Sequence, residues 1–467
     1  MNNLFVLLKR RINLILLSLI IIFAIILRLP SFFLSHYNND ELIHISLAKK
    51  VDKYGFDVFK KGEYNLFFLD KGFNPEGQFI GILDGKKETG SLLEGFLAES
   101  EKLSHHPPGL PLFIAMSHKI FSNNKEYLIN VSQNDYLMAQ NLGLQFYACF
   151  IPFLISILLI ISVCLLGSIF FSRNTGLLAS LIFSVIPIEL LTSNKIWADD
   201  MVALFATLAV ILFLYAIKGG NPFFCLLSGL SCGFSILAKM SGVYIVISIL
   251  LFHLLINYKK KASIKNIKDF IFDRNILYFL AGVFIVSAWW FNLYYSYFNI
   301  ASTKSYFIVN EQWETAKTWN SFFGTISNRP WFAYFILVPF QSPLLILSYI
   351  FIPFFMFRRR IGNLANFVKN EYSFIQFLIF WILTTFIFLT LKPGKELRYM
   401  LIAYPAICIL SSYSLDLIYQ WLKNKFPKDV VFIRFILVFI IFSSLLFSLK
   451  LGLPRVIFRS DLIPIPL

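Results

Sequence analysis

The chain has 467 residues, of which 57% are hydrophobic and 18% aromatic, and its mean hydropathy is +0.69. Only 15% of the residues are charged, whereas an ordinary soluble domain carries roughly 25%. These values exclude a cytosolic globular enzyme, a disordered chain and a disulfide-rich secreted module, and they predict a polytopic membrane protein.

Eleven apolar runs approach the length of about 20 residues that a helix needs to cross about 30 Å of hydrocarbon. They predict an all-α fold of about 11 transmembrane helices. The first run follows Lys9-Arg10-Arg11 and is too long for a signal peptide, so we interpret it as a signal anchor with a cytoplasmic N-terminus. The predicted spans are residues 12–29, 142–166, 176–193, 200–217, 222–238, 241–257, 276–298, 331–357, 373–391, 399–417 and 430–449.

Alternating these spans places most of the basic clusters in the connections on the cytoplasmic side, which supports this orientation in a cell membrane. The chain then divides into residues 1–29 with the first span, an outer loop at 30–140, a transmembrane bundle at 141–450 and a short tail at 451–467.

The outer loop holds 14 of the 26 acidic residues and five of the six histidines, and loops of this length are normally functional. Apolar positions with helical spacing at 41–54 and 126–140 predict helices lying on the bilayer surface. The chemistry of the protein is therefore expected on the outer face.

The formal net charge of +16 does not indicate a nucleic-acid partner, because the basic residues lie in short clusters at the ends of apolar segments. The five cysteines all fall within apolar runs, which favours small core residues over a disulfide framework or a metal site. We therefore expect membrane lipids, and no nucleic acid, as partners.

Ionisable residues at a membrane boundary are costly and are therefore functional candidates. The first group is Asn38-Asn39-Asp40-Glu41, just after the first span. Its paired carboxylates suit a general base that takes a proton from an attacking hydroxyl. The alternative is a helix start, in which Asn39 or Asp40 caps the helix at 41–54.

The second group is His105-His106-Pro107-Pro108, followed by Gly109-Leu110-Pro111. The prolines fix an extended backbone, and the imidazoles could contact an anionic group. The alternatives are a rigid re-entry loop ahead of the helix at 110–121, or a metal site formed by the two histidines and nearby carboxylates.

The third group is Trp197-Ala198-Asp199-Asp200, which opens the fourth span. Two carboxylates at a helix start gain from the helix dipole, so a plain helix start is one interpretation. Two adjacent acids at a bilayer boundary, on the same side of the membrane as Asp40, are nevertheless more than a helix cap needs, which favours a functional role.

The fourth group is Lys392-Pro393-Gly394-Lys395-Glu396-Leu397-Arg398-Tyr399, in an outer connection. Its cations contradict the positive-inside rule, and Arg398 can hold a phosphate through two parallel hydrogen bonds. Lys239, also on the outer side, could join them. The alternative is a cluster of snorkelling interfacial side chains.

Acids for a hydroxyl and cations for a phosphate, together at the outer leaflet, suit transfer from a lipid-phosphate donor. Residues 10–415 of the chain resemble the GT-C glycosyltransferase superfamily, in the branch of the protein O-mannosyltransferases and lipid A aminoarabinose transferases. The resemblance rests on the order and common side of Asp40-Glu41, His106-Pro107-Pro108, Asp199-Asp200 and Lys395-Glu396-Leu397-Arg398-Tyr399 with Pro405.

The resemblance implies a membrane glycosyltransferase that takes a sugar from a polyprenyl-phosphate donor and inverts its anomeric centre, with a glycan, lipid or protein as acceptor. Asp40 would be the catalytic base, oriented by Glu41. The donor phosphate would be bound by Lys395, Arg398, His106 and Lys239, and the sugar and acceptor pocket would be shaped by Asp199, Asp200, His105 and Tyr399. The resemblance fixes no cofactor, and a divalent metal is left open.

Two other functions remain open at this point. A transporter or flippase of a lipid-linked saccharide is the main alternative, although such proteins usually show repeats and charges at the membrane midplane, and no repeat is visible in the sequence. A non-enzymatic assembly or sensor protein would tolerate the loss of Asp40, Lys395 and Arg398 together.

Overall fold

The computed structural model describes residues 2–32, 107–121, 142–261, 273–298, 332–357, 372–391 and 396–458, together with positions 41, 44, 48, 51, 52 and 55. Over these residues the chain is almost entirely helical and has no strand. The predicted all-α fold class is confirmed, and its apolar helices make the chain a multi-pass membrane protein.

The α-helices are α1 (Asn2–Arg28), α6 (Gly109–Phe121), α7 (Leu142–Phe170), α8 (Arg173–Val185), α9 (Pro187–Ser193), α10 (Asp199–Gly219), α11 (Pro222–Ala238), α12 (Val243–Lys261), α14 (Arg274–Phe298), α16 (Ala333–Leu337), α17 (Ile346–Phe357), α19 (Tyr372–Thr390), α20 (Tyr404–Lys425) and α21 (Val430–Phe458). The 3-10 segments are η1 (Leu29–Phe32), η5 (Met240–Gly242), η9 (Pro339–Gln341), η10 (Pro343–Leu345), η12 (Leu397–Ala403) and η13 (Pro427–Asp429).

Every predicted apolar run coincides with helix in the structure. Among the described residues, five helices are long and apolar enough to cross a bilayer, the bent pair α8–α9 would make a sixth, and five further apolar helices are shorter. The number of eleven spans therefore stays a prediction. Of the two predicted surface helices, the described positions from 41 to 52 are helical, whereas 126–140 lies outside the described residues. Helix α6 covers the segment 110–121, for which the re-entry alternative of the histidine motif expects a helix.

Two of the predicted spans are interrupted, and both interruptions come at proline. Helices α8 and α9 meet at an angle of 68° at Pro187, and α16 is separated from α17 by two 3-10 turns that begin at Pro339 and Pro343. Backbone groups freed at membrane depth must find partners inside the protein. The Ile188 N–H accordingly donates to the side-chain oxygen of Gln341 at 3.1 Å, so the two interrupted segments support each other.

Three serine hydroxyls fasten α11 to α10, which positions the candidate site. The donors Ser228, Ser231 and Ser235 give hydrogen bonds of 2.8, 2.7 and 3.0 Å to the main-chain oxygens of Ala209, Phe205 and Val202, respectively. Such interhelical bonds from small residues are typical of membrane bundles. Because all three donors lie on one face of α11, they fix its rotation and hold its C-terminal end beside the start of α10.

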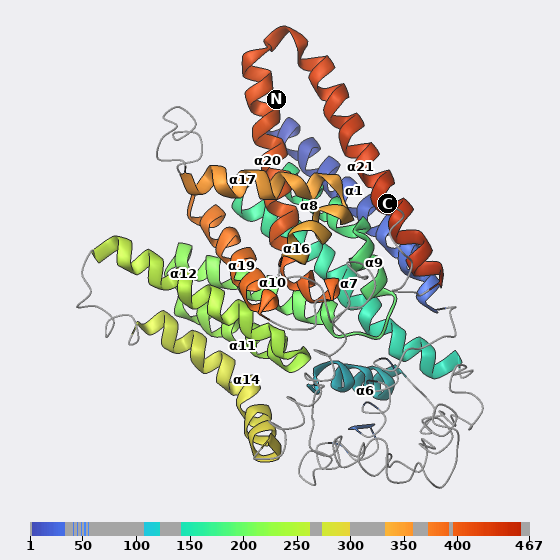
Figure 1. Ribbon diagram of the computed structural model, residues 1–467, viewed down its shortest axis with the longest axis vertical. Helices are drawn as coiled ribbons and strands as arrows, with labels where there is room; N and C mark the ends of the chain where they lie inside the picture. Colours follow the sequence, from blue (N-terminus) through green and yellow to red (C-terminus); the bar gives the residue numbers. More distant parts are fainter. Residues whose placement is uncertain are drawn as a thin grey trace.

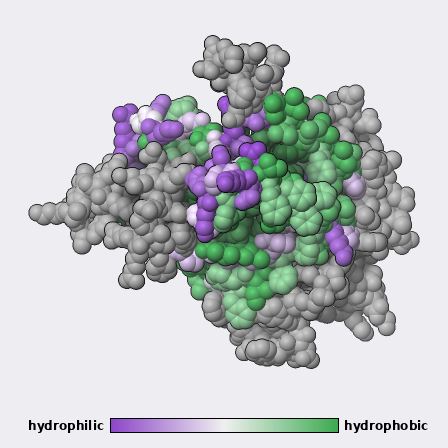
Figure 2. Space-filling model, turned by 90° about the horizontal axis from the view of Figure 1, so that it is seen from above, coloured by the Kyte–Doolittle hydropathy of each residue, from purple (hydrophilic) through white to green (hydrophobic). Residues whose placement is uncertain are grey.

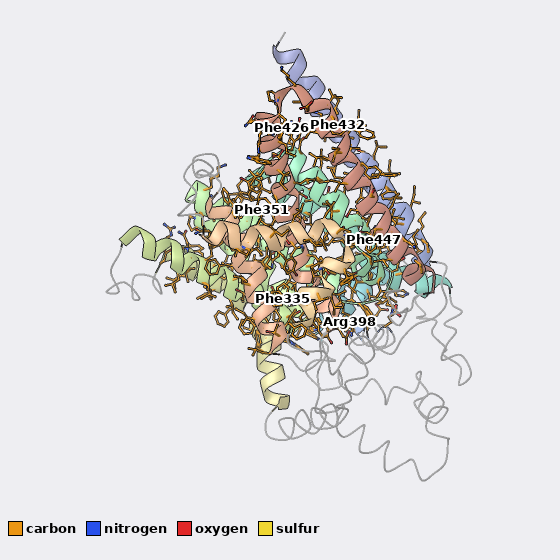
Figure 3. The ribbon with its side chains drawn as sticks, turned by 45° about the horizontal axis from the view of Figure 1, so that its top comes forward. Phe335, Phe351, Arg398, Phe426, Phe432 and Phe447 are labelled. Atoms are coloured by element: carbon orange, nitrogen blue, oxygen red, sulfur yellow. The ribbon has the colours of Figure 1, made fainter. Side chains whose placement is uncertain are left out.

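The molecule has two distinct ends. Helix α6 lies below the bundle in Figure 1, whereas α20 and α21 form a hairpin at the top. In Figure 3, Arg398 lies far from Phe426 and Phe432 at the turn of this hairpin. Below, the α6 end means α6 together with η12, and the hairpin end means residues 423–434.

Candidate functional site

Three segments far apart in sequence bring charged and aromatic side chains together at the α6 end. Asp199 opens α10, Lys239 follows the last residue of α11, and η12 carries Arg398 and Tyr399. Trp197 lies just before α10, and η12 packs against α10. We call these five residues the η12 cluster.

Lys239 forms an ion pair with Asp199. Its Nζ lies 2.7 Å from Asp199 Oδ1, and the same ammonium lies 4.5 Å from the centre of the Tyr399 ring. Asp199 is 4% exposed but Lys239 is 26% exposed, so the pair is open on the lysine side. Lys239 therefore lies beside Tyr399 of η12, and its part in binding a phosphate stays a prediction.

Arg398 lies over two aromatic rings. Its guanidinium carbon is 4.0 Å from the centre of the Trp197 ring and 5.5 Å from that of Tyr399. The Lys195 ammonium also lies over Trp197, at 4.3 Å. Cation–π contacts of this kind contribute about 0.5–1 kcal/mol at exposed sites and more when desolvated. The Trp197 and Tyr399 rings therefore hold the Arg398 and Lys195 cations close to the Lys239 ammonium.

Glu396 anchors the start of η12. Its carboxylate forms an ion pair with Arg398 and accepts a hydrogen bond from the Tyr399 hydroxyl at 3.0 Å. Its main-chain oxygen accepts a hydrogen bond from the Tyr334 hydroxyl at 3.1 Å. Glu396 lies inside the predicted motif, but no role was predicted for it, because the motif does not show which way its side chain points.

Asp200 lies apart from Lys239, although it is adjacent to Asp199 in sequence. It is fully buried, and its Oδ1 accepts a hydrogen bond from the Thr192 hydroxyl at 3.0 Å. Its second oxygen has no hydrogen-bond partner among the described residues. Of the two predicted pocket acids, therefore, Asp199 lies in the η12 cluster and Asp200 lies behind it.

Glu41 ties the outer loop to this cluster. It is almost fully buried, and its carboxylate accepts a hydrogen bond from the Ile196 N–H at 2.9 Å. Ile196 directly precedes Trp197 in the chain. Position 41 is helical, as the helix-start interpretation of the Asp40-Glu41 motif also predicts.

The Pro-Pro part of the histidine motif lies close to Lys239. Pro107 and Pro108 are buried, and α6 begins directly after them at Gly109. A Cβ atom on Gly109 would lie 2.6 Å from the main-chain oxygen of Leu237, so only glycine lets α6 approach the end of α11 this closely. Asp40, His105, His106 and Lys395 lie outside the described residues, and their roles stay predictions.

A second group of charged side chains lies inside the bundle and was not predicted from the sequence. Arg28 and Glu189 form an ion pair with both side chains fully buried. Arg28 Nε donates to Ser156 Oγ at 2.8 Å, and the Ser156 hydroxyl donates to Glu189 at 2.5 Å. The available signal was a charged residue within each of two apolar runs, which is costly and therefore meaningful.

No group of three or more metal-ligating side chains occurs among the residues that the structure describes. A divalent metal therefore stays open, since Asp40 and both histidines of the motif are not among them. The η12 cluster places two cations at the edge of an apolar bundle, and each of them forms an ion pair with one carboxylate. This arrangement can bind an anionic group, and a phosphate is the group for which an arginine and a lysine on neighbouring segments are best suited.

Comparisons with known proteins agree with the fold. A family model for dolichyl-phosphate-mannose-protein mannosyltransferase matches residues 94–306. No curated protein sequence matches the chain. The archaeal oligosaccharyltransferase AglB from Archaeoglobus fulgidus, solved with an inhibitory peptide and a dolichol-phosphate, aligns over 96% of this chain with a TM-score of 0.58 and 13% identity. The chain spans only 56% of that protein's length.

A second solved structure is ArnT from Cupriavidus metallidurans bound to undecaprenyl phosphate. It aligns over 95% of this chain and 72% of its own length, with a TM-score of 0.50 and 13% identity. AglB and ArnT are both GT-C glycosyltransferases. The resemblance expected from the sequence is thus confirmed: this chain has the fold of the GT-C glycosyltransferases and carries a segment similar to the dolichyl-phosphate-mannose-protein mannosyltransferase family.

Proposed function

We propose that this chain is a membrane glycosyltransferase that transfers a sugar from a polyprenyl-phosphate donor to a hydroxyl or phosphate acceptor, with inversion at the anomeric carbon. The reaction takes place at the outer face of a cell membrane, with the N-terminus in the cytoplasm. The acceptor is a glycan, a lipid or a protein.

The observation that carries this proposal is the convergence of Lys239 and Arg398 on Tyr399, at the α6 end of an apolar bundle. Both cations are already oriented by carboxylates, Asp199 and Glu396. A donor phosphate arriving from the bilayer would accept hydrogen bonds from the exposed side of these cations. Electrostatic stabilisation that is oriented in advance costs little reorganisation during the reaction.

In the transfer step, the acceptor oxygen attacks the anomeric carbon while the bond from that carbon to the phosphate oxygen breaks. The bonding electrons pass to the phosphate, whose growing negative charge is stabilised by Arg398 and Lys239, with Lys395 as a predicted third cation. The acceptor proton passes to the Asp40 carboxylate. Attack opposite to the leaving phosphate inverts the anomeric centre.

Glu41 supports the role of its sequence neighbour Asp40. Its hydrogen bond to the Ile196 N–H holds position 41, which is helical, close to the η12 cluster. Asp199, paired with Lys239, would orient that cation and face the sugar. His106 and His105, which immediately precede the buried prolines ahead of α6, would add contacts to the phosphate and to the sugar.

The comparisons support the donor class. AglB was solved with a dolichol-phosphate and ArnT with undecaprenyl phosphate, and both molecules are polyprenyl-type phosphates. An oligosaccharyltransferase from Archaeoglobus fulgidus was also solved tethered to an acceptor peptide, which supports an acceptor site in this fold.

The test is release of label from a panel of radiolabelled polyprenyl-phosphate sugars, with the full chain purified in detergent. We expect release with one donor, and a loss of at least about 100-fold in Asp40→Asn, because general-base catalysis contributes roughly 10²–10⁴-fold. Asp429→Asn, an exposed acid at the hairpin end, is the matched control and should keep full activity.

Turnover retained in Asp40→Asn would contradict the assigned base. Absence of release with every donor, combined with net movement of labelled lipid across proteoliposomes, would contradict the transferase and favour the flippase.

A further inference from the structure

A groove of about 250 Å³ lies between α8, α20 and α21. Its polar lining is Asn174 and Thr175 of α8, Ser412, Asp416 and Tyr419 of α20, and Arg434 of α21. The remaining wall is mostly aliphatic. The groove lies toward the hairpin end of α20, whereas the η12 cluster lies just before the first residue of that helix, so the two sites are separate.

The hairpin end has the character of a membrane interface. Lys423, Lys425 and Lys428 are exposed there, and α21 presents large exposed apolar side chains beyond the turn, such as Phe432 and Phe435. Figure 2, seen from this side, shows a hydrophilic cluster bordered by hydrophobic surface. A molecule in the groove would therefore reach both headgroup depth and the hydrocarbon.

The groove carries opposite charges that do not neutralise each other. No ion pair joins Asp416 to Arg434 among the residues that the structure describes. Arg434 Nε instead donates to the Tyr419 hydroxyl at 2.8 Å, and Asp416 is hydrogen-bonded by Gln420. A charge near the membrane interior is costly unless an opposite charge lies beside it. A ligand that carries both a negative and a positive group would therefore pair with Arg434 and with Asp416.

The size of the groove limits the ligand. Pockets for whole small molecules usually measure about 300–1,000 Å³, so this groove fits a headgroup better than a complete ligand. The aliphatic wall continues along α21 through Leu437, Val438 and Ile441, and Val438 is 63% exposed. An acyl chain can follow this surface into the bilayer.

We propose that this groove binds a zwitterionic phospholipid, phosphatidylethanolamine, through the juxtaposition of Arg434 and Tyr419 with Asp416 beside the aliphatic face of α21. The lipid phosphate accepts hydrogen bonds from Arg434 and from the Tyr419 hydroxyl, and the primary ammonium donates to Asp416. Charge-assisted hydrogen bonds of this kind are the stronger class. The site is independent of the transferase activity proposed above.

The test is native mass spectrometry of the full chain in detergent with equal amounts of phosphatidylethanolamine, phosphatidylglycerol and phosphatidylcholine of matched acyl chains. We expect one retained phosphatidylethanolamine per chain, with about tenfold preference over the other two lipids. Phosphatidylcholine is the lipid-side control, because its quaternary nitrogen has no N–H to donate to Asp416. This arm needs no variant and therefore does not depend on how a variant folds.

The protein-side arms separate the two charges. Asp416→Asn should remove the preference for phosphatidylethanolamine over phosphatidylglycerol, and Arg434→Gln should reduce retention of all three lipids. Lys428→Gln removes an exposed cation outside the groove and should leave retention unchanged. Equal retention of the three lipids by the unmodified chain, wild-type selectivity in Asp416→Asn and Arg434→Gln, or a lipid-free dimer showing that a second copy covers the groove would each overturn the proposal.

Discussion

The Arg28–Glu189 pair and the ion pairs of the η12 cluster differ in how much of each charge is accessible. Arg28 and Glu189 are completely enclosed between α1, α7 and the bent pair α8–α9. In the η12 cluster, Lys239 and Arg398 keep part of their side chains exposed although both have a carboxylate partner. An enclosed pair can act only on the protein around it, whereas an open pair can exchange its partner for a ligand.

The enclosed pair therefore serves the architecture. Arg28 donates to Ser156 of α7 and to the main-chain oxygen of Ser184 near the end of α8, and its carboxylate partner comes from α9 after the proline break. One guanidinium thus joins three helices at the point where the backbone of the predicted third span is interrupted. Such a pair is costly to break because the remaining charge stays buried.

The largest expected effect comes from breaking this enclosed pair. Glu189→Gln leaves the Arg28 charge buried without its counter-ion and should cost about 3–5 kcal/mol of stability. The measurement is the melting temperature and the yield of monodisperse protein in detergent. The double variant Arg28→Met/Glu189→Gln, which removes both charges of the pair, should recover part of the loss. Unchanged stability in Glu189→Gln would refute the architectural role.

The second expected effect comes from breaking the Lys239–Asp199 pair and should lower the rate of sugar release. Lys239→Gln removes one cation from the proposed donor phosphate and should lower the rate of sugar release by about 10²–10³-fold, which is the usual cost of removing one such donor. Because Asp199 is then left without its cation, the double variant Lys239→Gln/Asp199→Asn is the matched control for stability. If the double variant regains activity along with stability, Lys239 serves the fold and the distinction between the two pairs fails.

The smallest effect tests the aromatic support of the cluster. Trp197→Phe keeps a ring beneath Arg398 and Lys195, and the indole N–H that it removes has no hydrogen-bond partner among the described residues. The weaker ring should cost about 0.5–1 kcal/mol, or roughly twofold to fivefold in activity. Trp197→Leu, which removes the ring face, should lower activity further. Equal activity in both variants would show that the ring faces do not support the cations.

More of the fold than of the site could be predicted from the sequence, because a membrane helix can be recognised from the apolar run that forms it. Every predicted run contains helix, whereas the bend at Pro187 could not be foreseen together with its partner: the Ile188 N–H donates to the side chain of Gln341, 153 residues away. Topology placed Lys239 and Arg398 on one side of the membrane but could not show that both meet at Tyr399. That meeting depends on the serine contacts that set the rotation of α11 against α10.

The partner of each charged side chain was the feature hardest to predict from the sequence. Asp199 and Asp200 look equivalent in sequence, yet a helix turns by about 100° per residue, so one acid meets Lys239 and the other meets Thr192. Arg28 and Glu189 are separated by 161 residues, and no local pattern relates them. Rules about the cost of a charge within an apolar run could have marked each residue as unusual but could not have named its partner.

The open charges of the η12 cluster are proposed to bind the donor phosphate. The most direct measurement is the affinity of the purified chain for undecaprenyl phosphate, in unmodified protein, in Arg398→Gln and in Arg173→Gln, an exposed arginine at the start of α8. We predict binding that weakens at least about tenfold in Arg398→Gln, from the loss of charge-assisted hydrogen bonds, and that is unchanged in Arg173→Gln. Equal affinity in all three proteins would contradict binding of the donor phosphate by the η12 cluster.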